Sequence, residues 1–174
     1  MHTVPVDVQI EKIVSGINAL PEQVAQAAAL ALNRTSEWMK GQVSKELSGE
    51  KRLKLKLIRD RIAIARANKK NLKSLLNCNF RGILACDLGS MRQTPAGAKA
   101  GGQLFEHAFI ATLKPGAKTG IYRRKTAKRF PVKSVMIPIF DEATKIIEEV
   151  AGDEAKIVFE KRFLHEIRRI TGAI

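Results

Sequence analysis

The feature that most constrains the fold of this chain is a long amphipathic stripe near its N-terminus. Apolar residues recur there at steps of three and four, with one threonine filling a gap: Val24, Ala28, Leu32, Thr35, Met39, Val43 and Leu47. This spacing places them on one face of an α-helix. The helix is predicted to begin at Pro21 and Glu22, because proline and acidic residues suit a first helical turn, and to end near Gly49. The alanine-rich run 25–31 leaves room for a neighbouring element to pack closely.

After a short basic helical segment at 53–58, the apolar period changes from three or four residues to two. Strands are predicted in five segments, namely 61–66, 80–86, 107–113, 120–124 and 132–137. The turns between them are rich in Gly, Asn and Pro, which favours antiparallel connections. The segment 89–102 shows no periodicity and few large apolar residues, so we expect a mobile loop.

A second helical pattern closes the chain between 141 and 170, with a bend expected at Gly152 and Asp153. Its second half carries a stripe of Ala155, Phe159, Phe163, Ile167 and Ile170. The predicted class is therefore α+β, with an N-terminal long helix, an antiparallel β-sheet of about four to five strands, and a C-terminal helix packed on the sheet.

Length and composition favour a folded protein. A chain of 174 residues fits a single domain, 1–174, and 45% hydrophobic residues can form a core. No apolar stretch reaches the ~18 residues of a membrane helix, and residues 1–10 contain Asp7 but no Lys or Arg, so we expect a soluble protein made in the cytoplasm. Cys78 and Cys86 are expected to be buried reduced thiols rather than a disulfide, redox or metal pair.

The charge distribution is uneven. Lys and Arg number 31 against 17 Asp and Glu, for a net charge of +14. Residues 40–81 hold 13 basic and 3 acidic side chains, 114–133 hold 8 and none, and 134–174 hold 6 and 8. Such polarity favours a protein that stacks on copies of itself or turns one face to nucleic acid, although a solvated basic face remains an alternative. Few aromatic residues interleave with the basic ones, so any DNA contact should be non-specific.

Motifs for catalysis fail on inspection. His165 and Glu166 would need a second histidine at Arg169 to form a helical zinc site. The run from Gly116 to Thr119 lacks the glycine spacing of a phosphate-binding loop. The serines and histidines form no nucleophile elbow. We therefore predict no enzyme activity, no catalytic or metal-binding residues and no cofactor.

Ordered motifs in the second half resemble a known family. His107–Leu113 (HAFIATL), Gly120–Arg124 (GIYRR) and Arg129–Pro138 (RFPVKSVMIP) are similar to consecutive strands of the minor tail protein Z family of tailed phages, the tail completion proteins. In the first half, Ala31–Thr35 (ALNRT) is similar to an A-x-N-R signature on the first long helix. Lys51–Ile58 is similar to a basic helical turn before the first strand, so the resemblance covers nearly the whole chain in order.

The resemblance implies a structural virion protein of the head-proximal tail or neck, assembled in the host cytoplasm. It implies a homo-oligomeric ring, expected as a hexamer, that completes the tail and supports head-tail joining and DNA passage. The implied partners are other copies, tail tube or tail terminator and connector proteins, and phage DNA through non-specific contact, with no membrane. The alternative function is a freestanding, non-specific nucleic-acid-binding protein.

Two sets of residues are predicted to have a role, one in contacts with a partner or DNA and the other in the fold. Ten basic residues are expected to face a partner or DNA: Lys51, Arg52, Lys54, Lys56, Arg59, Arg123, Arg124, Lys125, Lys128 and Arg129. The last five belong to a hairpin, where they could instead only protect edge strands from aggregation. Six motif residues are expected to be structural: Asn33, Arg34, Phe109, Ile110, Pro131 and Pro138. Asn33 and Arg34 are expected to bond a neighbouring loop, and Trp38 to be a core or interface anchor rather than a ligand platform.

Overall fold

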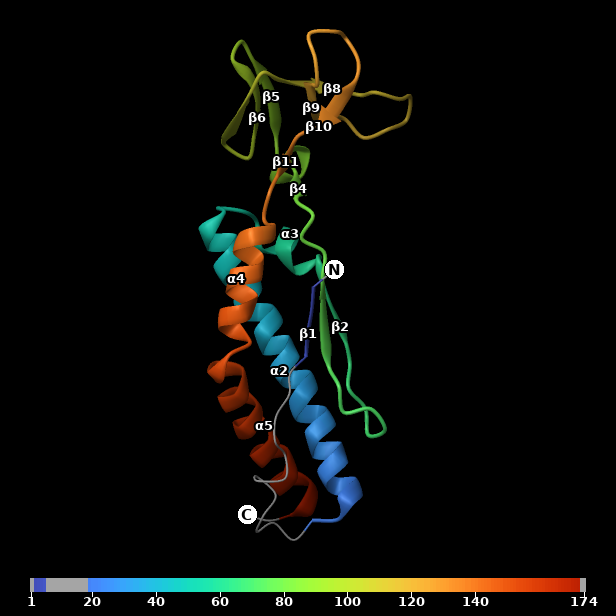
Figure 1. Ribbon diagram of the computed structural model, residues 1–174, viewed down its shortest axis with the longest axis vertical. Helices are drawn as coiled ribbons and strands as arrows, with labels where there is room; N and C mark the ends of the chain where they lie inside the picture. Colours follow the sequence, from blue (N-terminus) through green and yellow to red (C-terminus); the bar gives the residue numbers. More distant parts are fainter. Residues whose placement is uncertain (1, 6–18, 173–174) are drawn as a thin grey trace. The chain divides into compact units, whose positions relative to one another are not determined.

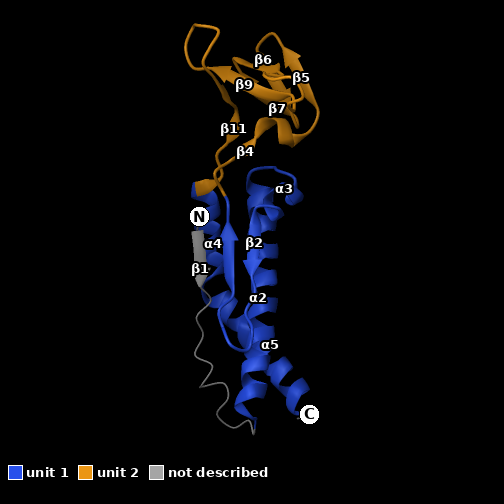
Figure 2. Cartoon of the chain, turned by 90° about the vertical axis from the view of Figure 1, so that its right-hand side faces the viewer, with its two compact units in different colours: residues 1–79, 141–174 blue, residues 80–140 orange. Residues whose placement is uncertain are grey.

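The computed structural model describes residues 2–5 and 19–172. The expectation drawn from the charges of residues 1–10 falls mostly outside these residues. The chain divides into two compact units, with Met1–Asn79 and Asp141–Ile174 in unit 1 and Phe80–Phe140 in unit 2 (Figure 2). The single-domain assignment stays a prediction, and each unit is described by itself below.

Helices dominate unit 1. The long helix α2 spans Pro21–Glu50, as its amphipathic stripe predicts, and the short helix α3 spans Leu55–Arg59. The helix α4 spans Phe140–Val150 and α5 spans Asp153–Thr171, so the bend predicted at Gly152 is a complete break. At the start of α2 the side chain of Gln23 accepts a 2.9 Å hydrogen bond from the Leu20 backbone N–H, which satisfies a group that the helix itself leaves unpaired.

The core of unit 1 lies between α2 and α5, which run antiparallel side by side (Figure 1). Fully buried alanines of α2, among them Ala28 and Ala31, form one cluster with Phe159 and Phe163 of α5, whose ring centroids are 5.9 Å apart. Small side chains on one helix leave room for large ones on the other, as the alanine run predicts. Burying each phenylalanine contributes about 2–3 kcal/mol.

A three-stranded antiparallel sheet completes unit 1. Its strands β1 (His2–Pro5), β2 (Ile62–Ala65) and β3 (Leu75–Cys78) lie in the order β1-β3-β2. Ser36 of α2 donates a 2.7 Å hydrogen bond to Ser74, which in turn donates to the Ala65 carbonyl, so buried hydroxyls tie the helix to the β2–β3 hairpin.

Unit 2 consists of short antiparallel strands. Its elements are β4 (Ile83–Leu84), the 3-10 helix η1 (Ala85–Leu88), β5 (Met91–Thr94), β6 (Gly97–Ala100), β7 (Gln103–Glu106), β8 (Ala108–Ala111), β9 (Gly120–Arg124), β10 (Val132–Ser134) and β11 (Met136–Ile137). Two sheets have three strands, in the orders β5-β6-β7 and β10-β9-β8. The strands β4 and β11 pair as a two-stranded sheet.

The prediction of a mobile loop at 89–102 is wrong, because the strands β5 and β6 lie there. This sheet depends on close approach rather than on large apolar side chains: Ala98 and Ala100 are buried, and Gly97 has a φ of +149°. A Cβ at Gly97 would come within 2.2 Å of the Phe105 carbonyl oxygen, so the position requires glycine. Glycine and alanine give no periodic apolar signal, which is why the pattern was missed.

The predicted α+β class, with its long N-terminal helix and its C-terminal helix, is confirmed. The arrangement of the strands differs from the prediction. The described strands form four small sheets instead of one sheet of four or five strands. The C-terminal helix also packs on α2 rather than on a sheet, since the aromatic stripe of α5 fits the alanine face of α2. Within residues 2–5 and 19–172, no helix has both the length and the apolarity needed to cross a membrane.

Candidate functional site

The β9–β10 hairpin carries the densest run of basic residues. The connection after Arg124 is closed by a 3.0 Å hydrogen bond from the Lys125 backbone N–H to the Pro131 carbonyl oxygen. Arg124, Lys125, Lys128 and Arg129 are exposed on it. The structure therefore brings four of the five predicted hairpin residues into one solvent-facing group, because Arg124 ends β9 and the other three lie in the turn that follows it.

The last two residues of β9, Arg123 and Arg124, have local partners. The half-buried Arg123 guanidinium donates a 2.9 Å hydrogen bond to the Glu106 carbonyl oxygen, which supports the β7–β8 connection. The Arg124 guanidinium lies 5.3 Å from the centroid of the Phe109 ring, a cation–π arrangement that leaves its charge unneutralised. In the described part of the chain, no carboxylate pairs with either of them or with Lys125, Lys128 or Arg129.

Unit 2 as a whole is strongly positive. It holds 11 basic residues against 2 acidic ones, a net charge of +9 out of the +14 of the chain. One of its two carboxylates, Asp87, is paired with Lys118 at 2.7 Å. This hydrogen bond and the Asp87 charge raise the pKa of the Lys118 amine. The unpaired excess of charge is thus concentrated in the smaller unit.

The second predicted basic group, at 51–59, divides into two kinds of residue. Lys51 lies 2.6 Å from a carboxylate oxygen of Glu142 on α4, and this hydrogen bond lowers the pKa of Glu142. Lys51 therefore joins α4 to the end of α2. The side chains around α3 that lie exposed without a carboxylate partner in the described residues are Arg52, Lys54, Lys56 and Arg59.

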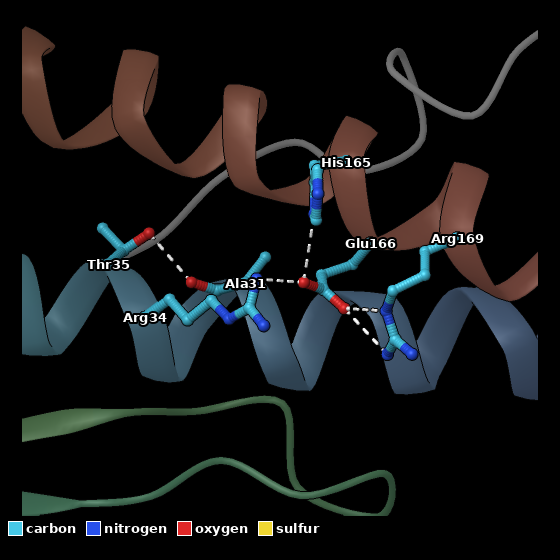
Figure 3. A network of polar contacts seen from close by, with 6 residues as sticks. All are labelled: Ala31, Arg34, Thr35, His165, Glu166 and Arg169. Atoms are coloured by element: carbon cyan, nitrogen blue, oxygen red, sulfur yellow. Dashed lines mark hydrogen bonds and ion pairs between the residues drawn. The ribbon is translucent and has the colours of Figure 1, made fainter. Parts of the chain in front are cut away.

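The two N-terminal motif residues, both expected to bond a neighbouring loop, have different kinds of partner. The Asn33 side chain makes two hydrogen bonds to the Ala67 backbone: its amide donates to the carbonyl at 3.0 Å, and its oxygen accepts from the N–H at 2.8 Å. Arg34 instead forms an ion pair with Glu166 of α5 (Figure 3). Both side chains hold α2 to its neighbours.

Glu166 is the functional-site candidate that sequence reasoning missed. Its carboxylate has no exposed surface and contacts Arg34, Arg169 at 3.0 Å and His165 at 3.3 Å (Figure 3). Burial alone raises the pKa of Glu166, but hydrogen bonds from Arg169 and His165 and the charges of both arginines outweigh it, so the pKa lies below its usual range. A glutamate beside the buried Ile167 in the apolar stripe of α5 was the available signal.

The remaining motif residues lie around β8 and β10 in unit 2. The Gln93 side chain accepts a 3.0 Å hydrogen bond from the Ile110 backbone N–H and donates to the Ala108 carbonyl oxygen at 3.3 Å, so it joins β5 to β8. The ring centroids of Phe109 and Tyr122 are 6.3 Å apart. Pro131 and Pro138 are exposed and border β10 and β11.

Side chains that could bind a metal or act as nucleophiles are not grouped together in the described part of the chain. Among residues 2–5 and 19–172 no three His, Cys, Asp or Glu side chains are grouped so as to hold a metal ion. Cys78 and Cys86 are free thiols, and burial raises the pKa of Cys78 to about 11. Trp38 is half-buried on α2, beside Arg34.

The chain is a strongly basic α+β protein, and the comparisons place it among the proteins of phage tails. The chain belongs to the prophage minor tail protein Z family, whose model matches residues 9–171. A curated relative, the tail completion protein of Escherichia phage N15, is 25% identical over 152 residues, covering 80% of this chain and 82% of that protein. No solved structure matches the chain.

Proposed function

We propose that this tail protein completes the phage tail at its head-proximal end, as a subunit of a homo-oligomeric ring. The ring contacts tail tube or terminator and connector proteins, supports head-tail joining and surrounds the path of the DNA. The role is structural and needs no catalytic step. Membership of the minor tail protein Z family and the name of the phage N15 relative, tail completion protein, support this proposal.

The observation that carries the proposal furthest is the unpaired charge of unit 2. A net charge of +9 in 61 residues repels copies of itself unless something acidic lies close by. The exposed hairpin residues Lys125, Lys128 and Arg129 can reach such a surface, because their side chains are long and have no carboxylate partner in the described residues. DNA passing through a ring, or an acidic neighbour in the tail, supplies the required charge.

The proposal is tested by reversing three hairpin charges, Lys125→Glu, Lys128→Glu and Arg129→Glu, in the phage. We expect tails to form but to join heads inefficiently, with infectious titre reduced by about a hundredfold or more, because like charges placed opposite each other cost several kcal/mol. Electron micrographs that count free tails and joined particles supply the measurement.

A matched control reverses Lys69, Lys70 and Lys73, which are exposed on the β2–β3 hairpin of unit 1. This variant carries the same total charge and should assemble normally. If both triple variants lose head-tail joining to the same extent, net charge matters rather than the hairpin. If both assemble like the parent phage, the hairpin has no role in joining.

DNA binding by the purified chain distinguishes the two acidic surfaces and tests the alternative function. Contact with phosphates predicts that log affinity falls with log salt at a slope of about −0.9 per phosphate neutralised, and that the hairpin variant has a flatter slope. DNA affinity in the absence of any phage partner, combined with normal head-tail joining in the variant, would favour a freestanding nucleic-acid-binding protein.

A further inference from the structure

A hollow of about 520 Å³ lies along the outer side of α2 in unit 1. Leu30 and Trp38 supply apolar surface to it, and Arg34, Arg66 and Arg162 supply positive charge, with Glu37 as its carboxylate. We call these six residues the arginine groove. Trp38 is the single tryptophan of the chain.

The positive charge of the arginine groove is only partly neutralised from within. Arg34 is already paired with the buried carboxylate of Glu166. Arg66 lies 2.7 Å from Glu37, but both side chains are about half exposed or more, so this pair contributes little by itself. Arg162 is exposed and has no carboxylate partner among the described residues. A second hollow along α2 shares Glu37, and it adds the cations Lys40, Lys56 and Arg59 together with one further carboxylate, Asp60.

A half-buried tryptophan surrounded by arginines is typical of an interface anchor. Tryptophan and arginine are enriched among the few residues that dominate binding energy at protein interfaces, where an apolar centre is surrounded by polar groups. An occupant of this groove should therefore present an apolar side chain flanked by carboxylates.

The beginning of α5 presents this pattern on the same chain. Ile157 is 49% exposed, an unusual position for a large apolar side chain in the first half of a packed helix. Glu154 and Glu160 lie three residues before and after it, on its two sides, and both are exposed without a cation partner in the described part of the chain. Glu148 and Glu149 add two exposed carboxylates at the end of α4. Asp153 also lies in the first turn of α5, but it is paired with Lys156 at 3.6 Å. We call Glu154, Ile157 and Glu160 the acidic knob.

One copy cannot fill its own groove with its own knob. Ile157 and Arg162 are five residues apart on α5, which at 3.6 residues per turn places them about 140° apart around the helix axis. The two surfaces therefore face different directions on one rigid element. A contact between them must join two copies, head to tail, and repeated contacts of this kind close into a ring when the rotation between copies allows it.

We propose that the arginine groove of one copy receives the acidic knob of the next copy. Ile157 then packs against Trp38 and Leu30, while Glu154 and Glu160 approach Arg66 and Arg162. The inference rests on the ring in the proposed function, and it assigns the surfaces through which the ring forms.

The test uses two charge-reversed full-length chains and sedimentation velocity over a concentration series. The groove variant carries Arg66→Glu and Arg162→Glu, and the knob variant carries Glu154→Lys and Glu160→Lys. We expect each alone to associate about a hundredfold or more weakly than the parent chain. An equimolar mixture should recover association, because each reversed surface then meets a complementary one.

Recovery in the mixture is a result that misfolding cannot produce, and circular dichroism melts check that each variant is folded. Arg168→Glu, on an exposed position of α5 outside both surfaces, is the matched control and should associate like the parent chain. If the parent chain associates and both variants associate equally well, the groove and knob assignment is wrong while the ring stands. Loss of association in both variants without recovery in the mixture shows that the two surfaces do not meet each other and overturns the groove-to-knob contact. A parent chain that stays monomeric at every concentration contradicts the ring itself.

Discussion

Removing both arginines that face Glu166 should destabilise unit 1 more than removing the glutamate itself. The Glu166 side chain has no exposed surface, whereas those of Arg34 and Arg169 are 46% and 56% exposed. Without Glu166, water can solvate both arginines. Without the arginines, a carboxylate remains buried with only His165 beside it. We therefore compare Glu166→Leu with the double variant Arg34→Ala, Arg169→Ala.

The magnitude follows from the geometry of the network. Two unit charges 3.0 Å apart attract by about 5 kcal/mol at an effective dielectric constant of ~20, and solvent screening of a half-exposed arginine leaves a net of about 1 kcal/mol per pair. Glu166→Leu should therefore cost about 1–2 kcal/mol. The double variant leaves an uncompensated buried charge and should cost about 3–5 kcal/mol. Adding Glu166→Leu to it should restore part of this loss.

Urea unfolding followed by circular dichroism measures these free energies. The pH dependence has a defined sign. In the parent chain the pKa of Glu166 is lowered, so its stabilisation is present above the unfolded pKa of about 4.3 and is lost as pH falls through the folded pKa. In the double variant burial dominates and raises this pKa, so its deficit relative to the parent should shrink as pH falls. The reasoning is refuted if the double variant costs no more than Glu166→Leu, or if the triple variant is the least stable.

Two further predictions concern single contacts. Asn33→Ala should lower the free energy of unfolding by about 1–3 kcal/mol, because it leaves the N–H of the buried Ala67 without a partner. Asn33→Asp keeps the acceptor oxygen and should lower the free energy of unfolding less. Equal losses for the two variants would contradict this reasoning. Gly97→Ala should destabilise unit 2 by about 1–3 kcal/mol, whereas Gly41→Ala, inside α2 with open space around its Cβ, should stabilise the chain by about 0.5–1 kcal/mol. Thermal melts that shift in the same direction for both glycine variants would refute the second prediction.

The helices were predictable because their periodic patterns are long. The stripe of α2 and the aromatic stripe of α5 each extend over several turns, so the faces they bury could be read from spacing alone. Their packing on each other was suggested only by the alanine run. The sequence could not show that α5 would choose this face rather than a sheet, because that choice depends on the fit of Phe159 and Phe163 to it.

The strands of unit 2 were harder to predict for a physical reason. They are two to five residues long, and neither the mainly polar β5 (MRQT) nor the small-residue β6 (GAKA) carries a hydrophobic period. The strand β9 has the bounds predicted for it, because Gly120 and the arginines delimit it. Among candidate site residues, the exposed hairpin cations were foreseen from charge. Glu166 was not, because its network forms only when Arg34 of the distant helix α2 reaches it in the fold.

The pairing of β4 with β11 gives unit 2 the character of an insertion with its own stem. Residues 80–140 form unit 2 and are inserted between two segments of unit 1. The stem, formed by β4 and β11, pairs residues near the two ends of this insertion. A flexible loop of this length would oppose its own closure by roughly 4 kcal/mol of chain entropy. Because the β4–β11 pair already brings the ends of the insertion together, α4 and α5 can pack on α2 as if a short loop joined them to β3. Lengthening or trimming β5–β7 should therefore leave the helical unit able to form.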